Sequence, residues 1–223
     1  MPGSSRLNPI PTGFLALDQE AGTGGWPAGH IVELVGPARW AAEALAYHAI
    51  CSALKMGGVA ALVLLGRAAN QATEVALPVD PSRVPRFAAA NVLEALQIVA
   101  DLGRRGDVSI AVLDGYASVA EGDTEPAGAI GRAMRSAAAA ARLSGMAVIA
   151  INSPSEAEPD AGGLTQAAKA LKEHASLRVY LSDPLPYDGR RTRVEASIVK
   201  NRVAGRHGHV TLFLAAPKPE GGP

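Results

Sequence analysis

Cysteine is almost absent from the sequence, and neither sign of charge is in excess. Cys51 is the only cysteine, which excludes an intramolecular disulfide and a cysteine-rich zinc site. Its apolar, helix-like surroundings favour a buried structural thiol. Lysine plus arginine and aspartate plus glutamate both number 21, so the formal net charge is zero. Dedicated nucleic-acid binders usually carry a basic excess, so any affinity for DNA would need a local basic patch.

Long hydrophobic runs are also missing. The longest one, residues 59–65, is far too short to span a bilayer, and residues 1–11 contain no apolar core of signal-peptide length. We therefore expect a cytoplasmic protein that does not bind membranes. The chain has 223 residues, of which 48% are hydrophobic, and this is enough for one packed globular domain.

The two ends of the chain differ in composition from the middle. Residues 1–11 are polar and proline-rich and are interpreted as an N-terminal arm. Residues 217–223 form a proline- and glycine-rich tail that we expect to be disordered. No linker, repeat or long block of charge interrupts residues 12–216, so we interpret them as one core domain.

Within this core, short apolar runs alternate with helical stretches. The runs expected to be buried strands are residues 31–35, 59–65, 109–113 and 147–151. The stretches expected to be helices are residues 40–55, 88–104 and 127–144. This alternation predicts an α/β fold with a mostly parallel central sheet flanked by helices. Antiparallel edge strands are expected near the C-terminus, at residues 176–181, 194–200 and 210–214.

A glycine-rich segment precedes the first expected strand. Thr12-Gly13 and Leu17-Asp18 come first, and residues 24–29 follow with the sequence Gly-Gly-Trp-Pro-Ala-Gly. This order and spacing resemble the lead-in to the phosphate-binding loop of RecA and RadA recombinases. Further on, Gly162-Gly163, residues 170–172 (Ala-Leu-Lys) and residues 175–178 (Ala-Ser-Leu-Arg) resemble the same family. The resemblance spans residues 12–214 and implies a RecA-like P-loop NTPase fold.

The phosphate-binding loop itself departs from the family pattern G-x-x-x-x-G-K-[ST]. In that pattern, glycines let backbone N–H groups approach the phosphates, the lysine meets the β/γ charge, and the hydroxyl ligates Mg²⁺. Only Gly36 survives: Ala41 stands at the second glycine, Ala42 replaces the lysine, and Glu43 replaces the hydroxyl. Losing one charge-assisted hydrogen bond costs on the order of 1.5–3 kcal/mol. We therefore expect ATP and Mg²⁺ to bind weakly or not at all, and we expect no cofactor.

Two residues inside the loop leave alternatives open. Arg39 could substitute for the missing lysine, because arginine is a good phosphate ligand, although it lies three positions early. Trp40 either fills the space that the phosphates vacate or lies exposed as an anchor for a partner.

The other ATPase residues of the family are only partly present. Residues 65–70 contain no carboxylate, although the family places the glutamate that activates water there. Asp114 stands at the Walker B position, where it would help to hold Mg²⁺, or else it caps a turn. Asn152 ends the strand that senses the γ-phosphate in the family, and Ser153 replaces the glutamine beside it. Because the loop and the catalytic base are lost together, we expect that the chain is not an enzyme.

Charge patterns bear on DNA binding. Residues 153–161 match the second DNA-binding loop of recombinases, but they contain three carboxylates and no basic or aromatic residue. Such a loop would repel phosphates, so DNA binding is expected to be weak or indirect. Lys200 and Arg202 match the basic residues with which one RecA protomer reaches the ATP of its neighbour, or else they are solvated residues of an edge hairpin. The candidate contacts with DNA or an acidic partner are Lys200, Arg202, Arg190, Arg191, Arg193 and Arg206.

A short RecA-like chain with a degenerate phosphate loop resembles the ImuA family, accessory proteins of bacterial mutagenic translesion synthesis. This resemblance implies a non-catalytic role in the SOS response to DNA damage. It also implies three partners: an ImuB-like polymerase homologue, an error-prone polymerase subunit and RecA. Two alternatives stay open. One is an ATPase whose deviant site uses Arg39, Asp114, Lys200 and Arg202, and the other is a recombination mediator that binds DNA through the basic C-terminal hairpins.

Overall fold

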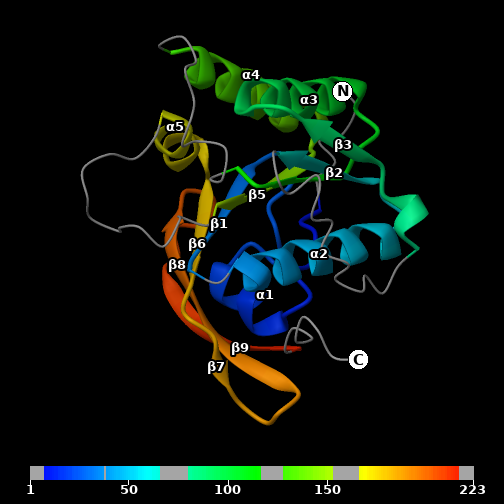
Figure 1. Cartoon of the computed structure of the whole chain (residues 1–223). Coiled ribbons are helices and arrows are strands. Elements are labelled where there is room, and N and C mark those ends of the chain that lie inside the picture. The colour runs from blue at the N-terminus through cyan, green and yellow to red at the C-terminus, as the bar shows by residue number, and fades with distance from the viewer. Residues whose placement is uncertain (1–7, 38, 66–79, 117–127, 153–165, 216–223) are drawn as a thin grey trace, which may run out of the picture.

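The computed structural model describes residues 8–37, 39–65, 80–116, 128–152 and 166–215. One nine-stranded sheet runs through the centre of the molecule (Figure 1). Its strands are β1 (Ile31–Val35), β2 (Ala60–Leu65), β3 (Arg86–Ala89), β4 (Ile110–Asp114), β5 (Ala147–Asn152), β6 (Leu177–Leu181), β7 (Leu185–Pro186), β8 (Arg191–Asn201) and β9 (Gly208–Ala215).

The strand order is β3-β2-β4-β5-β1-β6-β8-β7, and β9 also pairs with β8. The six strands from β3 to β6 in this order pair in parallel. Strand β8 pairs antiparallel with β6, β7 and β9. The structure therefore confirms the predicted fold class, a mostly parallel sheet with antiparallel strands at its C-terminal edge.

Helices cover both faces of the parallel part of the sheet (Figure 1). They are α1 (Leu15–Ala21), α2 (Arg39–Lys55), the 3-10 helix η2 (Pro81–Arg83), α3 (Val92–Arg105), α4 (Ala129–Ser144) and α5 (Gln166–His174). Helix α2 packs on one face of these parallel strands, and α3, α4 and α5 pack on the other. Helix α1 lies on the same side of the sheet as α2 but packs against β8 and β9. Along β2, Leu62 and Leu64 join the first core and Val63 and Leu65 join the second. Because both faces are buried, the parallel strands have continuous apolar sequences.

The helix expected over residues 88–104 begins later than predicted. Residues 86–89 form β3, which pairs in parallel with β2. The backbone N–H of Glu94 donates to Asn91 Oδ1 (2.9 Å), and the N–H of Ala90 donates to Glu94 Oε2 (2.7 Å). This reciprocal cap starts α3 at Val92. Strand pairing thus outweighs the high helix propensity of the preceding alanines.

The glycine-rich lead-in contains a helix, α1, that sequence analysis did not predict. The backbone N–H of Thr12 donates to Asp18 Oδ1 (3.0 Å), so the Thr-Gly and Leu-Asp pairs of the motif contact each other. Gly22 ends α1 with a φ of 67°, in the left-handed region that favours glycine. Leu17 is buried in the first core. The motif therefore has a structural role in attaching the lead-in to the domain.

Several predictions concern residues outside the described ranges. They are the missing catalytic glutamate near residues 66–70, the acidic segment 153–161, the glycine pair 162–163, most of the N-terminal arm and the tail 217–223. These remain predictions from the sequence alone.

Candidate functional site

The residues expected at a nucleotide site come together at one edge of the parallel sheet. Asp114 is the last residue of β4 and Asn152 the last residue of β5, and Gly36 directly follows β1. Strand β5 lies between β4 and β1, so these three ends are neighbours. In open α/β sheets, ligands bind at this carboxyl-terminal edge.

Arg39 links two carboxylates at this edge. It is the first residue of α2, and its Nε donates to Glu43 Oε1 (2.6 Å) one helical turn later. Its Nη2 donates to Asp114 Oδ1 (2.6 Å), which lies 75 residues away in the sequence. The side chains of Glu43 and Asp114 are buried, and that of Arg39 is 35% exposed. The Arg39 guanidinium thus lies between Glu43, which stands at the position of the Mg²⁺-binding hydroxyl in the family pattern, and Asp114 at the Walker B position.

Burial and the mutual charges of this triad both shift the pKa values of its members. Burial raises the pKa of Asp114 to about 6; the Arg39 guanidinium acts in the opposite direction, and the Glu43 carboxylate adds to the rise. Burial by itself would lower the pKa of Arg39, but Asp114 and Glu43 hold it above its usual value. Burial and the same two carboxylates also raise the pKa of Tyr47 on α2. Two carboxylates thus share one guanidinium, an arrangement poorly suited to anions.

The remaining loop residues have structural roles. A Cβ atom at Gly36 would collide with the carbonyl oxygen of Leu181, so close packing against β6 accounts for this glycine. Ala42, at the lysine position, is buried in the first core. Trp40 is half-buried and packs against the same core, and its two predicted roles both stay predictions. Ala38 lies outside the described residues.

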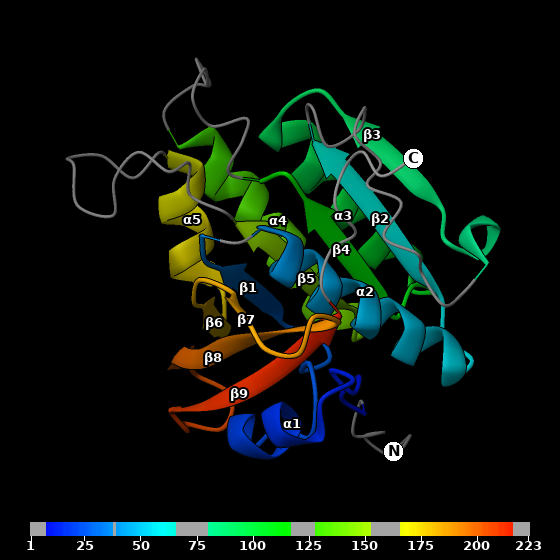
Figure 2. The same ribbon diagram turned by 60° about the horizontal axis from the view of Figure 1, so that its bottom comes forward.

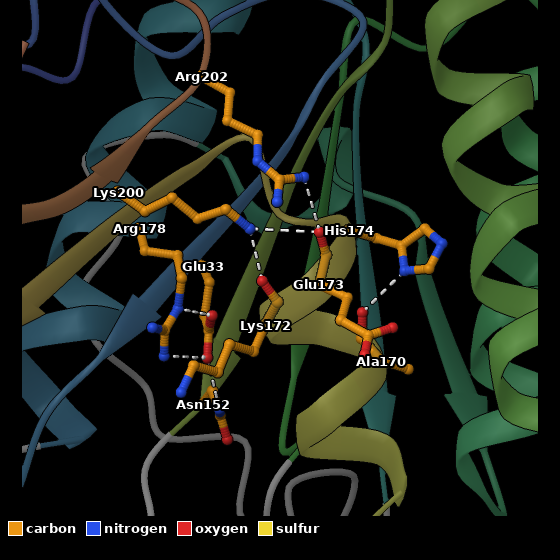
Figure 3. A network of polar contacts seen from close by, with 9 residues as sticks. All are labelled: Glu33, Asn152, Ala170, Lys172, Glu173, His174, Arg178, Lys200 and Arg202. Atoms are coloured by element: carbon orange, nitrogen blue, oxygen red, sulfur yellow. Dashed lines mark hydrogen bonds and ion pairs between the residues drawn. The ribbon is translucent and has the colours of Figure 1, made fainter. Parts of the chain in front are cut away.

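A second buried network includes Asn152. Its Nδ2 donates to Glu33 Oε1 (2.7 Å), and Glu33, on β1, is completely buried. Arg178, which lies opposite Glu33 on the adjacent strand β6, donates to both oxygens of that carboxylate (Figure 3). The amide of Asn152 is therefore engaged within the protein core.

Lys200 and Arg202 contact a helix end of their own chain. Lys200 Nζ donates to the carbonyl oxygens of Lys172 (2.5 Å) and Glu173 (3.2 Å), and Arg202 Nη1 donates to that of Glu173 (3.0 Å) (Figure 3). These carbonyls belong to the last turn of α5, where cations stabilise the helix. Burial lowers the pKa of Lys200, as do the nearby Arg202 and Arg178. The two side chains thus cap α5, a role that neither sequence-based interpretation included.

The structure separates the basic residues that were expected to form one patch. Arg191 and Lys200 lie nine positions apart on β8, or about 30 Å at about 3.3 Å per residue. Arg190, Arg191 and Arg193 are at one end of β8, and the others are at or beyond its other end. Several are already engaged: Arg191 with Asp188, Arg193 with Glu195, and Arg206 with the carbonyl of Gln19. A single basic surface formed by all six residues is therefore not present.

Sequence analysis missed the partners of the two buried charge networks. Arg39 was considered as a phosphate ligand, but its spacing of four residues from Glu43 already indicated an ion pair on one helix face. Glu33 lies inside an apolar strand, and a carboxylate in such a strand requires a buried partner. That signal points to a partner without identifying Arg178 or Asn152, because the strand order decides which residues are neighbours.

Within the described ranges, no group of three or more histidine, cysteine, aspartate or glutamate side chains is placed to hold a metal ion. None of the helices in those ranges has the length and apolar character needed to cross a membrane.

Comparison with known proteins identifies the family. The sequence model of the RecA N-terminal domain matches residues 3–213. The protein RecA of Bifidobacterium breve is 34% identical over 218 residues, which cover 87% of this chain and 54% of the relative. The RecA of Symbiobacterium thermophilum is 35% identical over 222 residues, covering 90% of this chain and 63% of the relative. This chain thus spans between 54% and 63% of the length of these relatives, and it belongs to the RecA family.

Proposed function

We propose that this chain is a non-catalytic accessory protein of the bacterial DNA damage response. In this proposal it supports SOS-induced translesion synthesis, as ImuA-like proteins do, through contacts with other proteins. The observation that carries the proposal is the bridge from Arg39 to Glu43 and Asp114 at the place where a nucleotide site would hold Mg²⁺. Membership of the RecA family supports the link to DNA damage.

The charges at the site oppose nucleotide binding. A Mg²⁺ ion coordinated by Asp114 would first have to displace Arg39, breaking a charge-assisted hydrogen bond of 2.6 Å. Each such bond is worth about 1.5–3 kcal/mol, and every ~1.4 kcal/mol changes affinity tenfold. Ala42 offers the phosphates no positive charge, and Glu43 adds a negative one. An ATPase that uses Arg39 would therefore have to dismantle its own ion pairs before binding.

The proposal that this chain does not bind nucleotide predicts that ATP leaves the stability of the protein nearly unchanged. A ligand at about 100 times its dissociation constant adds about 2.7 kcal/mol of stability, or roughly 5–10 °C in Tm for a domain of this size. We expect Mg²⁺-ATP at about 1 mM to raise Tm by less than about 1 °C, which corresponds to a dissociation constant near or above 1 mM. Differential scanning fluorimetry with and without nucleotide measures this shift.

A repaired loop provides the matched control. The quadruple variant Arg39→Ser, Ala41→Gly, Ala42→Lys and Glu43→Thr restores the loop pattern and frees Asp114, so it should gain a Tm shift that depends on Mg²⁺. Circular dichroism checks that this variant is folded. A clear stabilisation of the unmodified chain by Mg²⁺-ATP, abolished by Asp114→Ala, would contradict the proposal and favour a working nucleotide site.

The partner proposal predicts a complex that needs no nucleotide. The proposed partners are an ImuB-like polymerase homologue, an error-prone polymerase subunit and RecA. Co-expression of the chain with each of them, followed by size-exclusion chromatography in buffer without nucleotide, should yield co-elution with at least one. Complexes that form only with Mg²⁺-ATP, or the absence of any complex with all three, would count against this role.

A further inference from the structure

Strand β9 has a free edge in the part of the chain that the structure describes. All eight of its residues pair with β8, from Gly208 opposite Ile198 to Ala215 opposite Arg191, without a register shift. No other strand pairs with it, and no backbone hydrogen bond outside this ladder reaches it among the described residues. Figure 2 shows β9 at the end of the sheet, beyond β8.

The other edges of the sheet are protected by devices that β9 lacks. Strand β3 has only four residues and begins with the exposed Arg86. Strand β7 has two residues, and one of them is Pro186. Proteins commonly protect sheet edges through shortness, charge or proline, because an open edge pairs readily with another strand. The sequence of β9, Gly-His-Val-Thr-Leu-Phe-Leu-Ala, contains no lysine, arginine, acidic residue or proline.

The two faces of β9 differ. Leu212 and Leu214 are buried in the core that α1 also joins. On the opposite face, Phe213 is 40% exposed, and its ring lies 4.6 Å from that of Tyr187, which is 56% exposed. Leu185 on β7 is also exposed. Leu185 and Tyr187 lie on the far side of β8 from β9, and the Arg191 guanidinium lies over the rings of Tyr187 and Phe213. Phe213 is therefore the exposed large apolar side chain that β9 itself presents near its free edge.

We propose that β9 is a self-association edge, on which the β9 strands of two copies of this chain pair antiparallel about a two-fold axis. Two-fold pairing is closed, so it covers both free edges. In this pairing the β9 strands of the two copies lie side by side, and neither contains a lysine, arginine or acidic residue. No like charges therefore meet across the new ladder. The chain has 21 basic and 21 acidic residues, so long-range repulsion between copies is also absent. This interface lies away from the Arg39 site and does not depend on the proposed function.

The test is the mass of the full chain in solution as a function of concentration. Sedimentation velocity from about 1 to about 100 µM should show a change from the 22.8 kDa monomer to a dimer of twice that mass. The double variant Thr211→Lys and Phe213→Lys places like charges on the edge, so the dimer should weaken by roughly 30-fold or more. Val199→Lys, an exposed position on β8, is the matched control and should leave dimerisation unchanged.

Hydrogen exchange on the unmodified chain gives a second readout that does not depend on the folding of the variants. Backbone amides of β9 should exchange more slowly at about 100 µM than at about 1 µM, whereas those of β3 should not change. A chain that stays monomeric at the highest concentration would overturn the proposal. So would a dimer that protects a different segment, or one that withstands the double lysine variant. Slower exchange of β9 only in the presence of another protein would assign the edge to that partner instead.

Discussion

Replacement of Arg178 by methionine should lower the free energy of unfolding by about 3–5 kcal/mol, the largest loss that we expect from one substitution. Glu33 is completely buried, and Arg178 is the cation that balances its charge. Methionine would leave the carboxylate with the amide of Asn152 as its hydrogen-bond donor. A buried charge without a partner is costly because the carboxylate loses its hydration. Urea unfolding followed by circular dichroism measures the change.

Removal of both charges distinguishes this explanation from a general loss of packing. The double variant Glu33→Gln and Arg178→Met keeps an amide oxygen that can accept from Asn152 and leaves no buried charge. It should therefore recover most of the stability lost in Arg178→Met. Arg105→Met, which removes a surface ion pair with Asp107, serves as the control and should change stability by less than about 1 kcal/mol. A double variant no more stable than Arg178→Met would refute the electrostatic explanation.

Replacement of Arg39 by methionine should cost about 2 kcal/mol at about pH 8 and less at about pH 5. The estimate lies below that for Arg178 because the Arg39 side chain is 35% exposed and partly screened by solvent. Two buried carboxylates, Glu43 and Asp114, would lose the cation that they share. Unfolding curves at both pH values, compared with those of Arg105→Met, measure the difference.

The direction of this pH dependence follows from the raised pKa of Asp114. Burial already brings that pKa to about 6, and loss of the guanidinium would raise it further. The corresponding group in the unfolded chain has a pKa of about 3.9. As pH falls through the raised folded-state value, the folded protein takes up a proton that the unfolded chain does not yet bind, so its stability increases. A destabilisation that grows as the pH falls would show that Arg39 does not stabilise the triad in this way.

Under the proposed function, the candidate site belongs to a RecA-like scaffold that keeps its fold without holding a nucleotide. Gly36 and Ala42 have packing roles, and Arg39 neutralises carboxylates that would otherwise be buried without a cation. The Walker B aspartate is thus held in an ion pair within the chain, in which Arg39 offsets part of the cost of burying its charge. Fold and chemistry are separable, so family membership alone does not assign an activity to this chain.

The sequence by itself determined the fold class and the changes in the loop. Residues 31–35 and 147–151 were recognised as buried strands because a parallel strand covered on both faces is apolar throughout. The replacement of the lysine and hydroxyl by Ala42 and Glu43 is visible directly in the loop sequence. The resemblance to RecA rested on ordered local motifs, and the family match over residues 3–213 confirms it. These features are local in the chain, so they can be read without coordinates.

Only the tertiary structure decided which charged groups meet. Arg39 contacts Asp114 across 75 residues, and Arg178 contacts Glu33 across 145 residues. Both contacts exist because the strand order places β4, β5, β1 and β6 side by side. The same arrangement places Lys200 at the end of α5. Burial makes such pairings energetically important, and burial depends on how distant segments pack, which local sequence patterns do not specify.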